Sequence, residues 1–571
     1  MAAHGARAAD TGADAQFKAI YMKEWDWRKD QYGIRDEEDT RQPFLDHLPK
    51  ADAAAEAARL DYWTGVMKEI DAIPRDQLSP EVQVDYDVYK PQLEALIADE
   101  QFRDYEMPVN SDSAFYSDIT ETARDNFRTV ADYRNYVKWL GDVPRYFHEE
   151  IADMRAGLKR GFTPPKVTMA GRDKAIEAVA DSKPEDSVFL EPFKKNTLKI
   201  PAPEWDSLRA EAVKTVQASV IPAYRDLLQF MRNDYIPGTR DTLAADALPD
   251  GAAYYKSKIL EFTTLDLDPA DVHKIGLQEV ATIHGKMVEE MHKTGFKGDF
   301  AAFLKYLRTD PKFYVDQPDE LLRRAAWIAK EFDGKASTYF GLLPRARFAI
   351  KPVPADIAPF YTAGRGGPGV YLLNTYDLKS RPLYNLTALT LHESAPGHAF
   401  QIPLASERKD TPDFRRMTYI SAYGEGWALY CERLGLEMDM YKTPYDVFGM
   451  WGYQIWRAAR LVVDTGIHSQ GWTREQAIQY MRDNTALPER EIGTEVDRYI
   501  SWPGQALSYY LGEMAILKAR DKAEKALGPK FSLRAFHDTV LQMGSVPLPV
   551  LDARIDRFIA EDGKGPYPDL E

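Results

Sequence analysis

Two histidines and a glutamate stand close together in residues 392–398, which read His-Glu-Ser-Ala-Pro-Gly-His. Imidazole nitrogens are common zinc ligands, and a glutamate beside them can act as the general base of a hydrolytic reaction. These residue types point to metal-assisted hydrolysis. We expect His392 and His398 to bind the metal and Glu393 to activate the attacking water.

The spacing of the histidines differs from the His-Glu-x-x-His motif, in which they are four residues and about 40° apart on one helical face. Six residues rotate a regular helix by about 240°, so His392 and His398 could not share an ion on an uninterrupted helix. Pro396 lacks an N–H and would clash with the carbonyl of His392, and Gly397 can adopt unusual backbone angles. We therefore expect a two-residue bulge over 395–397 that returns His398 to the ligand position.

A catalytic zinc site needs a third protein ligand and an open position for water. Glu425 is the candidate, because it follows His398 by 27 residues on the helix predicted over 418–436. We expect its neighbours Gly424 and Gly426 to let this helix pack closely against the helix of 382–395. The predicted cofactor is one Zn²⁺ per chain, although manganese or cobalt could use the same ligands.

Helical periodicity dominates the elements that must position these residues. Apolar residues recur three or four positions apart along most of the chain, most clearly over 53–67 and 129–158. We predict a mainly α protein with two lobes, an N-terminal helical lobe over 15–240 and a catalytic helical lobe over 241–571.

Residues 345–375 interrupt the helical pattern. Segments 348–353 and 369–375 predict two short strands around the glycine-rich loop 364–369, which lacks the Gly-Lys-Ser/Thr ending of a phosphate loop. We expect a small sheet beside the helix of His392. Its strand 369–374 would lie along the site and pair with an extended peptide by strand addition, so that Tyr361 and Asn374 contact substrate.

Asp464 and His468 are four residues apart and share a helical face. Two interpretations are open. The pair could stand behind the metal site and donate to a ligand or to the oxyanion. It could equally be an independent structural pair.

Composition excludes several classes of function. The 571 residues carry a net charge of −16 with no clustered basic face, which argues against a nucleic-acid partner. No apolar run approaches the roughly 20 residues of a membrane span. Cys431 is the only cysteine, so an intramolecular disulfide is impossible. We expect a soluble protein, periplasmic or secreted if a signal peptide has been removed and otherwise cytoplasmic.

The chain resembles the bacterial family called domain of unknown function 885 over roughly residues 15–565. The resemblance rests on the blocks 392–398, 425–430, 460–468 and 503–509, together with 307–314. That family is similar in layout to gluzincin peptidases such as angiotensin-converting enzyme, thimet oligopeptidase and the thermostable carboxypeptidases. The resemblance implies a helical, two-lobed protein with a deep cleft, and the same three zinc ligands.

The resemblance also implies further site residues. Similar peptidases stabilise the tetrahedral intermediate with a tyrosine from a helix near the C-terminus, here Tyr509 with Tyr510 as the alternative. Arg498 and Gln505 are candidates to hold a substrate carboxylate.

Three functions agree with these residues. The first is a zinc peptidase acting on short peptides, as an oligopeptidase or a carboxypeptidase. The second is a zinc amidohydrolase of a small non-peptide amide. The third is a non-catalytic peptide-binding protein that keeps a peptidase scaffold, against which the presence of Glu393 and all three ligands argues.

Overall fold

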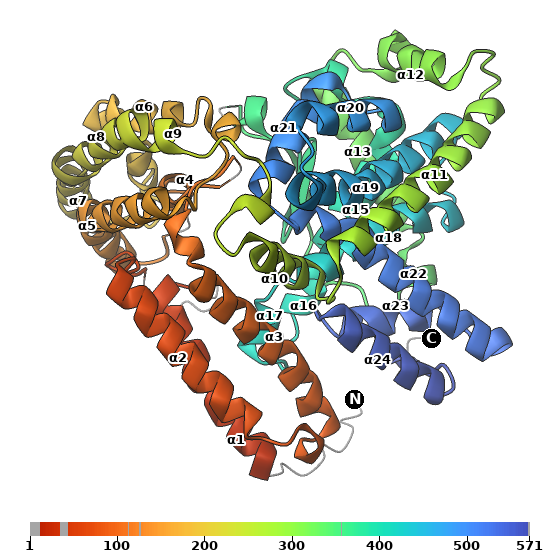
Figure 1. Ribbon diagram of the computed structural model, residues 1–571, viewed down its shortest axis with the longest axis horizontal. Helices are drawn as coiled ribbons and strands as arrows, with labels where there is room; N and C mark the ends of the chain where they lie inside the picture. The colour runs from red at the N-terminus through yellow and green to blue at the C-terminus, as the bar shows by residue number, and fades with distance from the viewer. Residues whose placement is uncertain (1–11, 35–43, 112, 125–126, 356, 569–571) are drawn as a thin grey trace. The chain divides into compact units, whose positions relative to one another are not determined.

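The computed structural model describes residues 12–34, 44–111, 113–124, 127–355 and 357–568. It is mainly α with one small three-stranded sheet, as predicted (Figure 1). The chain divides into an N-terminal unit, residues 1–86 and 92–254, and a C-terminal unit, residues 87–91 and 255–571. The main division therefore falls between Tyr254 and Tyr255, whereas the lobe boundary was predicted between 240 and 241.

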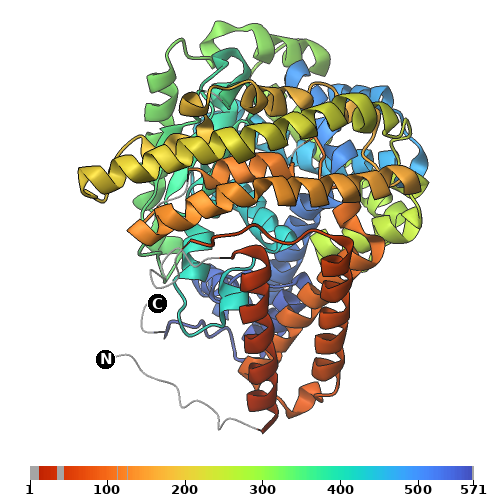
Figure 2. The same cartoon turned by 90° about the vertical axis from the view of Figure 1, so that its left-hand side faces the viewer.

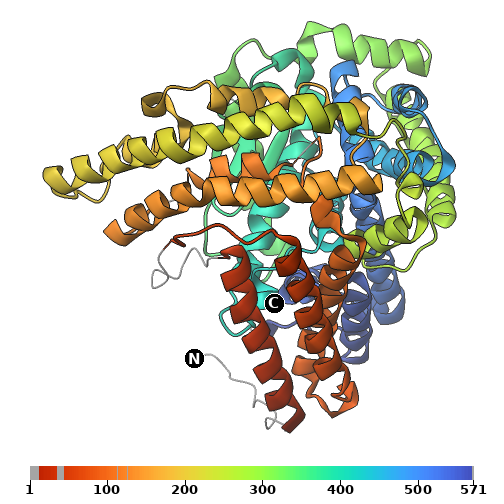
Figure 3. The same ribbon diagram turned by 60° about the vertical axis from the view of Figure 1, so that its left-hand side comes forward.

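Long helices build the N-terminal unit. The segment of 202–238 runs beside α5 (Figures 2 and 3). Thr129 and Asp132 form a capping box at the start of α5, which fixes where this helix begins. The helices are α1 (Gly12–Tyr32), α2 (Ala53–Asp71), α3 (Pro80–Phe102), α4 (Phe115–Thr122), α5 (Val130–Arg160), α6 (Asp173–Ala180), α7 (Ala202–Thr215), α8 (Ile221–Phe230) and α9 (Ile236–Gly238).

Two prolines are accommodated within the long α7 to α9 segment. Wider π-helical turns, Val216–Val220 and Met231–Tyr235, come immediately before the turns that contain Pro222 and Pro237. A proline ring clashes with the carbonyl four residues earlier, and the wider turn moves that carbonyl away. The helical segment that begins at Ala202 therefore continues to Gly238.

The C-terminal unit is organised around α19, which is buried continuously from Phe448 to His468. Helix α19 packs against α11, α15 and α20, and α18 packs against α15 and α22. The helices are α10 (Gly251–Thr263, which begins in the other unit), α11 (Pro269–Lys293), α12 (Phe300–Thr309), α13 (Pro318–Asp333), α14 (Ala336–Tyr339), α15 (Leu383–Glu393), α16 (His398–Ser406), α17 (Asp413–Arg416), α18 (Ser421–Glu437), α19 (Pro444–Gln470), α20 (Arg474–Asn484), α21 (Glu489–Ser501), α22 (Ser508–Leu527), α23 (Leu533–Gln542) and α24 (Leu548–Ala560).

The sheet has the order β1-β3-β2, with β1 (Ala349–Pro352) parallel and β2 (Gly364–Gly367) antiparallel to β3 (Val370–Leu373). Both predicted strands are present, but the glycine-rich segment forms a third strand. Pro368 and Gly369 make the turn between β2 and β3, with Gly369 at φ 75°. The expectation that a peptide pairs with strand 369–374 is wrong, because β3 is the central strand and both its edges are occupied.

No helix in the described part of the chain has the length and apolar character that spanning a bilayer requires.

Four buried carboxyl groups lie near one another in the N-terminal unit. They come from α2, α3 and α5 and belong to Glu56, Glu100, Glu150 and Asp153. Burial, with repulsion from the neighbouring carboxylates, raises the pKa of Glu100 and of Asp153 to about 8. Glu100 and Asp153 therefore remain largely protonated in the folded protein at neutral pH.

A raised carboxyl pKa makes the folded protein less stable as the pH rises from the unfolded-state pKa to the folded-state pKa, because the folded state then keeps a proton that the unfolded state has released. We expect the free energy of unfolding of the N-terminal unit to fall as the pH rises from about 5 to 8. Each unit of pKa shift corresponds to about 1.4 kcal/mol. Urea unfolding at several pH values will measure how steeply the free energy of unfolding falls with pH, and Glu100→Gln should flatten this slope.

The control is Glu81→Gln, exposed on the same helix, which should leave the slope unchanged. A slope in Glu100→Gln as steep as in the native protein would contradict the assignment.

Candidate metal centre

The backbone breaks between the two histidines. Helix α15 ends at Glu393 and α16 begins at His398, so a new helix replaces the predicted bulge. The Ala395–Pro396 peptide is cis. The Gly397 N–H donates to the carbonyl of Leu391 at 3.0 Å. A β-carbon on residue 397 would lie 1.8 Å from the carbonyl oxygen of His392, so only glycine fits there.

This break places both imidazoles against one carboxylate. The His392 and His398 ring centroids are 4.9 Å apart. Glu425 Oε2 lies 3.4 Å from His392 Nε2 and 3.3 Å from His398 Nε2. Zinc–ligand bonds of about 2.0–2.1 Å in a tetrahedron give ligand–ligand separations of about 3.3–3.4 Å. The two separations between Glu425 and the imidazoles therefore match those expected between ligands of one zinc ion.

Glu393 is a second carboxylate beside the histidines. The nearest potential ligand atoms of His392, Glu393 and His398 all lie within 4.8 Å of one another. Its Oε2, however, accepts a hydrogen bond of 2.6 Å from the Gly366 N–H of β2. Glu425 Oε2 is nearly equidistant from the two Nε2 atoms, so Glu425 fits the third ligand better and Glu393 fits the base.

Gly366 explains the composition of β2. A β-carbon on this residue would lie 1.7 Å from the backbone oxygen of Glu393. The strand therefore runs directly against the C-terminal end of α15, where any larger residue would push it away. Its N–H fixes the orientation of the Glu393 carboxylate.

Glu432 orients His392 from behind. Its Oε1 accepts a hydrogen bond from His392 Nδ1 at 2.8 Å, and the carboxylate is fully buried. This bond leaves Nε2 for a metal, an arrangement common in zinc sites. Glu432 was not predicted from the sequence, although its place seven residues after Glu425 puts both on one face of α18.

The charges of these groups depend on one another. Burial opposes protonation of His392, but hydrogen bonds to Glu425 and Glu432 raise its pKa to about 10. Burial likewise opposes ionisation of Glu425, but the charge of His398 and hydrogen bonds from both histidines hold its pKa well below the usual value. The carboxylates of Glu393, Glu425 and Glu432 surround two imidazoles. This excess of negative charge favours bound cations, either protons or a metal ion.

Tyr419 also reaches the site and was missed by the sequence analysis. Its hydroxyl donates to Glu425 Oε1 at 3.1 Å, and the residue is 46% exposed. A β-carbon on Gly424 would lie 2.3 Å from the Tyr419 ring. A β-carbon on Gly426 would lie 2.4 Å from the backbone of Gly512 on α22. The expectation that these glycines face the first histidine helix is therefore wrong, because they accommodate Tyr419 and α22.

The two candidate tyrosines of α22 have different surroundings. The Tyr510 hydroxyl donates to Glu279 of α11 at 2.7 Å. The Tyr509 hydroxyl accepts a hydrogen bond from Arg498 at 3.3 Å and lies close enough to Tyr419 to interact with it electrostatically. Of the two, Tyr509 remains the candidate for the oxyanion.

The predicted residues Arg498 and Gln505 lie together beside Tyr509, since Arg498 Nη2 donates to Gln505 Oε1 at 2.9 Å.

Arg457, which was not predicted, is 4% exposed, and its Nη2 lies 4.0 Å from Glu432 Oε1. Its Nε and Nη1 have no hydrogen-bond partner among the described residues. Buried N–H groups are normally satisfied, so this guanidinium is suited to an anionic group or water.

Two other predicted residues, Asp464 and His468, have structural partners. Asp464 accepts from the Tyr255 hydroxyl at 2.6 Å and from the Gly504 N–H, while His468 Nε2 lies 2.8 Å from the Tyr499 carbonyl. Burial raises the pKa of Asp464 to about 7. These contacts favour the independent structural pair.

Asn374 is 1% exposed, and its side-chain amide donates to the carbonyls of Ala358, Tyr361 and Thr362. It holds the 358–362 loop and is not available to substrate, so the prediction of substrate contact is wrong for Asn374. The Tyr361 side chain is half-buried, and its backbone carbonyl serves this loop clamp.

Two solved structures share this architecture. The crystal structure described as "the putative lipoprotein from Colwellia psychrerythraea" is 28% identical, covers 96% of this chain and 100% of its own, and superposes with a TM-score of 0.89. A "putative lipoprotein of unknown function from Shewanella oneidensis" is 17% identical, covers 94% and 98%, and has a TM-score of 0.68, which shows a shared fold. The comparison with curated proteins found no match.

The sequence itself identifies the family. The model of the family described as "Bacterial protein of unknown function (DUF885)" matches residues 29–555, which include every residue of the candidate metal centre. The chain belongs to this family.

Proposed function

We propose that this protein is a zinc-dependent metallopeptidase that hydrolyses short peptides. The observation that carries the proposal is the meeting of His392, His398 and Glu425 at 3.3–3.4 Å, with Glu393 directly beside them. Two imidazoles, one carboxylate and an adjacent second carboxylate form the arrangement of a hydrolytic zinc site.

Each residue has a chemical task in this proposal. A bound zinc ion supplies Lewis-acid polarisation of the carbonyl and lowers the pKa of water. Glu393 accepts the proton of the attacking water and passes it to the leaving amine. The Gly366 N–H holds one Glu393 oxygen during this transfer. Glu432 fixes the ring of His392. The Tyr509 hydroxyl is the proposed donor to the oxyanion, with Tyr419 as a second hydroxyl close to Glu425.

The edge of β2 is suited to hold an extended peptide. The Asn374 N–H donates to the Ala363 carbonyl, and with the register of β2 against β3 this turns the backbone groups of Gly364 and Gly366 away from the sheet. The Gly366 N–H indeed reaches Glu393. Because Glu393 already uses the Gly366 N–H, a peptide that pairs with this edge would use the other outward backbone groups and bring its backbone next to the base.

Arginines near Tyr509 favour substrates that carry an anionic end. Arg498 donates to Tyr509 and Gln505, and the Arg460 guanidinium lies 4.4 Å from the Tyr509 ring. The buried Nε and Nη1 of Arg457 have no hydrogen-bond partner in the part of the chain that the structure describes. A C-terminal carboxylate beside these groups would gain charge-assisted hydrogen bonds. We therefore favour trimming at the C-terminus over internal cleavage.

The compartment is part of the proposal. The two similar solved proteins are each described as a putative lipoprotein. These descriptions favour the exported alternative, periplasmic or secreted, over a cytoplasmic one.

Metal content tests the proposed ligands. Protein purified without chelator should contain about one zinc per chain by plasma emission, and Glu425→Gln should lose most of it. Glu432→Gln should weaken zinc binding by about 10–100-fold, because the His392 ring loses its charged hydrogen-bond acceptor. Glu475→Gln, exposed on α20, is the control. Full zinc occupancy in Glu425→Gln, or no zinc in the native protein after zinc is added back, would contradict the ligand set.

Activity of Glu393→Gln tests the base. On a library of quenched fluorescent peptides we expect kcat to fall by about 10²–10⁴-fold, the usual contribution of a general base, while zinc content stays the same. Undiminished turnover would refute this role. Hydrolysis of small non-peptide amides without peptide cleavage would instead support the amidohydrolase alternative.

Paired peptides with a free or amidated C-terminus test the role of Arg457. The native protein should prefer the free acid by about tenfold or more, since a hydrogen bond to a charged group contributes about 1.5–3 kcal/mol. Arg457→Gln should lose this preference, Arg457→Lys should keep part of it, and Arg482→Gln, on exposed α20, should keep all of it. Equal native cleavage of both peptides would refute recognition of the carboxylate.

A further inference from the structure

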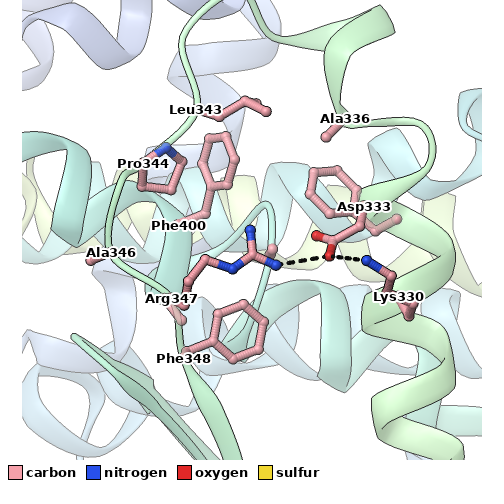
Figure 4. Close-up of a pocket in the computed structure, with 12 residues that line it drawn as sticks. Lys330, Asp333, Ala336, Leu343, Pro344, Ala346, Arg347, Phe348 and Phe400 are labelled. Atoms are coloured by element: carbon pink, nitrogen blue, oxygen red, sulfur yellow. Dashed lines mark hydrogen bonds and ion pairs between the residues drawn. The ribbon is translucent and has the colours of Figure 1, made fainter.

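A pocket of about 260 Å³ lies against the segment that joins the two histidine helices. Its walls come from α13, from the chain before β1, and from Ala395, Ala399 and Phe400 (Figure 4). Ala395 and Ala399 flank the segment 396–398, so a ligand in this pocket would rest against the backbone that places His398.

Hydrogen bonds hold the pocket wall in place before any ligand arrives. The Gly341 N–H donates to both carboxylate oxygens of Asp538 at 2.9 Å. Four residues later the N–H groups of Arg345 and Ala346 donate to Glu407, just after the C-terminal end of α16, at 3.0 and 2.7 Å. The intervening residues, which include Leu343 and Pro344 of the pocket, are therefore anchored at both ends.

The pocket joins an apolar wall to an excess of positive charge. Phe348, Phe400, Leu343 and Pro344 surround the space, and Leu343 is 45% exposed at its edge. Asp333 is shared by two cations, Arg347 at 3.0 Å and Lys330 at 3.2 Å, so one positive charge is not balanced within the pocket (Figure 4).

We propose that this pocket binds a small carboxylate with a compact apolar body. The carboxylate would pair with Arg347 and Lys330, and the apolar body would lie between the Phe348 and Phe400 rings and the alanine floor. The volume is below the roughly 300–1,000 Å³ of sites for drug-sized ligands, which limits the ligand to a short chain or a single ring. A free aliphatic or aromatic acid and the C-terminal residue of an apolar peptide share this chemistry. The site does not depend on the proposed peptidase function.

Titration calorimetry of the full-length protein with 4-phenylbutyrate tests the site. We expect saturable binding at one site, about tenfold weaker for Arg347→Gln and for the neutral 4-phenylbutyramide. Arg347 is exposed, so its replacement should not disturb folding. The matched control is Arg345→Gln, an exposed arginine two residues away whose side chain does not line the pocket.

Octanoate and N-acetyl-leucyl-phenylalanine distinguish the two sources of such a ligand. Arg347-dependent binding of octanoate alone supports a free acid, and Arg347-dependent binding of the dipeptide supports a peptide end. Absence of saturable binding for all three probes would overturn the proposal. So would binding that is equally strong in native protein and Arg347→Gln, because the ligand would then occupy another place.

Discussion

The contact of Gly397 with the carbonyl of His392 is the constraint on which the candidate metal centre depends. It lets the chain leave α15 and enter α16 within four residues, so that two histidines six positions apart face the same carboxylate. A side chain at residue 397 would overlap the His392 backbone. The distances from both imidazoles to Glu425, which match those in a tetrahedral zinc site, follow from this single close approach.

Buried packing on α18 and α19 holds the other half of the centre. Helix α18 carries Glu425 and Glu432 on one face, and it approaches α22 at Gly426 and Gly512, where neither residue has room for a side chain. The buried α19 brings Arg457 and Arg460 next to Glu432 and Tyr509. Burying this many charged side chains costs free energy unless they are paired. The rigid helices hold these side chains where they can pair.

The chain around the break between α15 and α16 contributes to two places with different chemistry. The candidate metal centre has imidazoles and carboxylates, and the pocket has phenylalanines, small alanines and two cations that share one carboxylate. His398 belongs to the first place, and Ala395 and Ala399, close to it in the chain, belong to the second.

The sequence by itself determined the helical class and selected His392, Glu393, His398 and Glu425 as candidates for the site, because helical periodicity and ligand types are local properties. It also indicated that Pro396 and Gly397 interrupt the helix. Only the tertiary structure decided that the interruption is a complete break, that the glycine-rich segment is an edge strand holding Glu393, and that Asn374 clamps a loop. It alone brought in Glu432, Tyr419 and Arg457. These outcomes depend on which backbones approach within van der Waals distance and which buried polar atoms find partners, and neither is encoded in the spacing of residues along the chain.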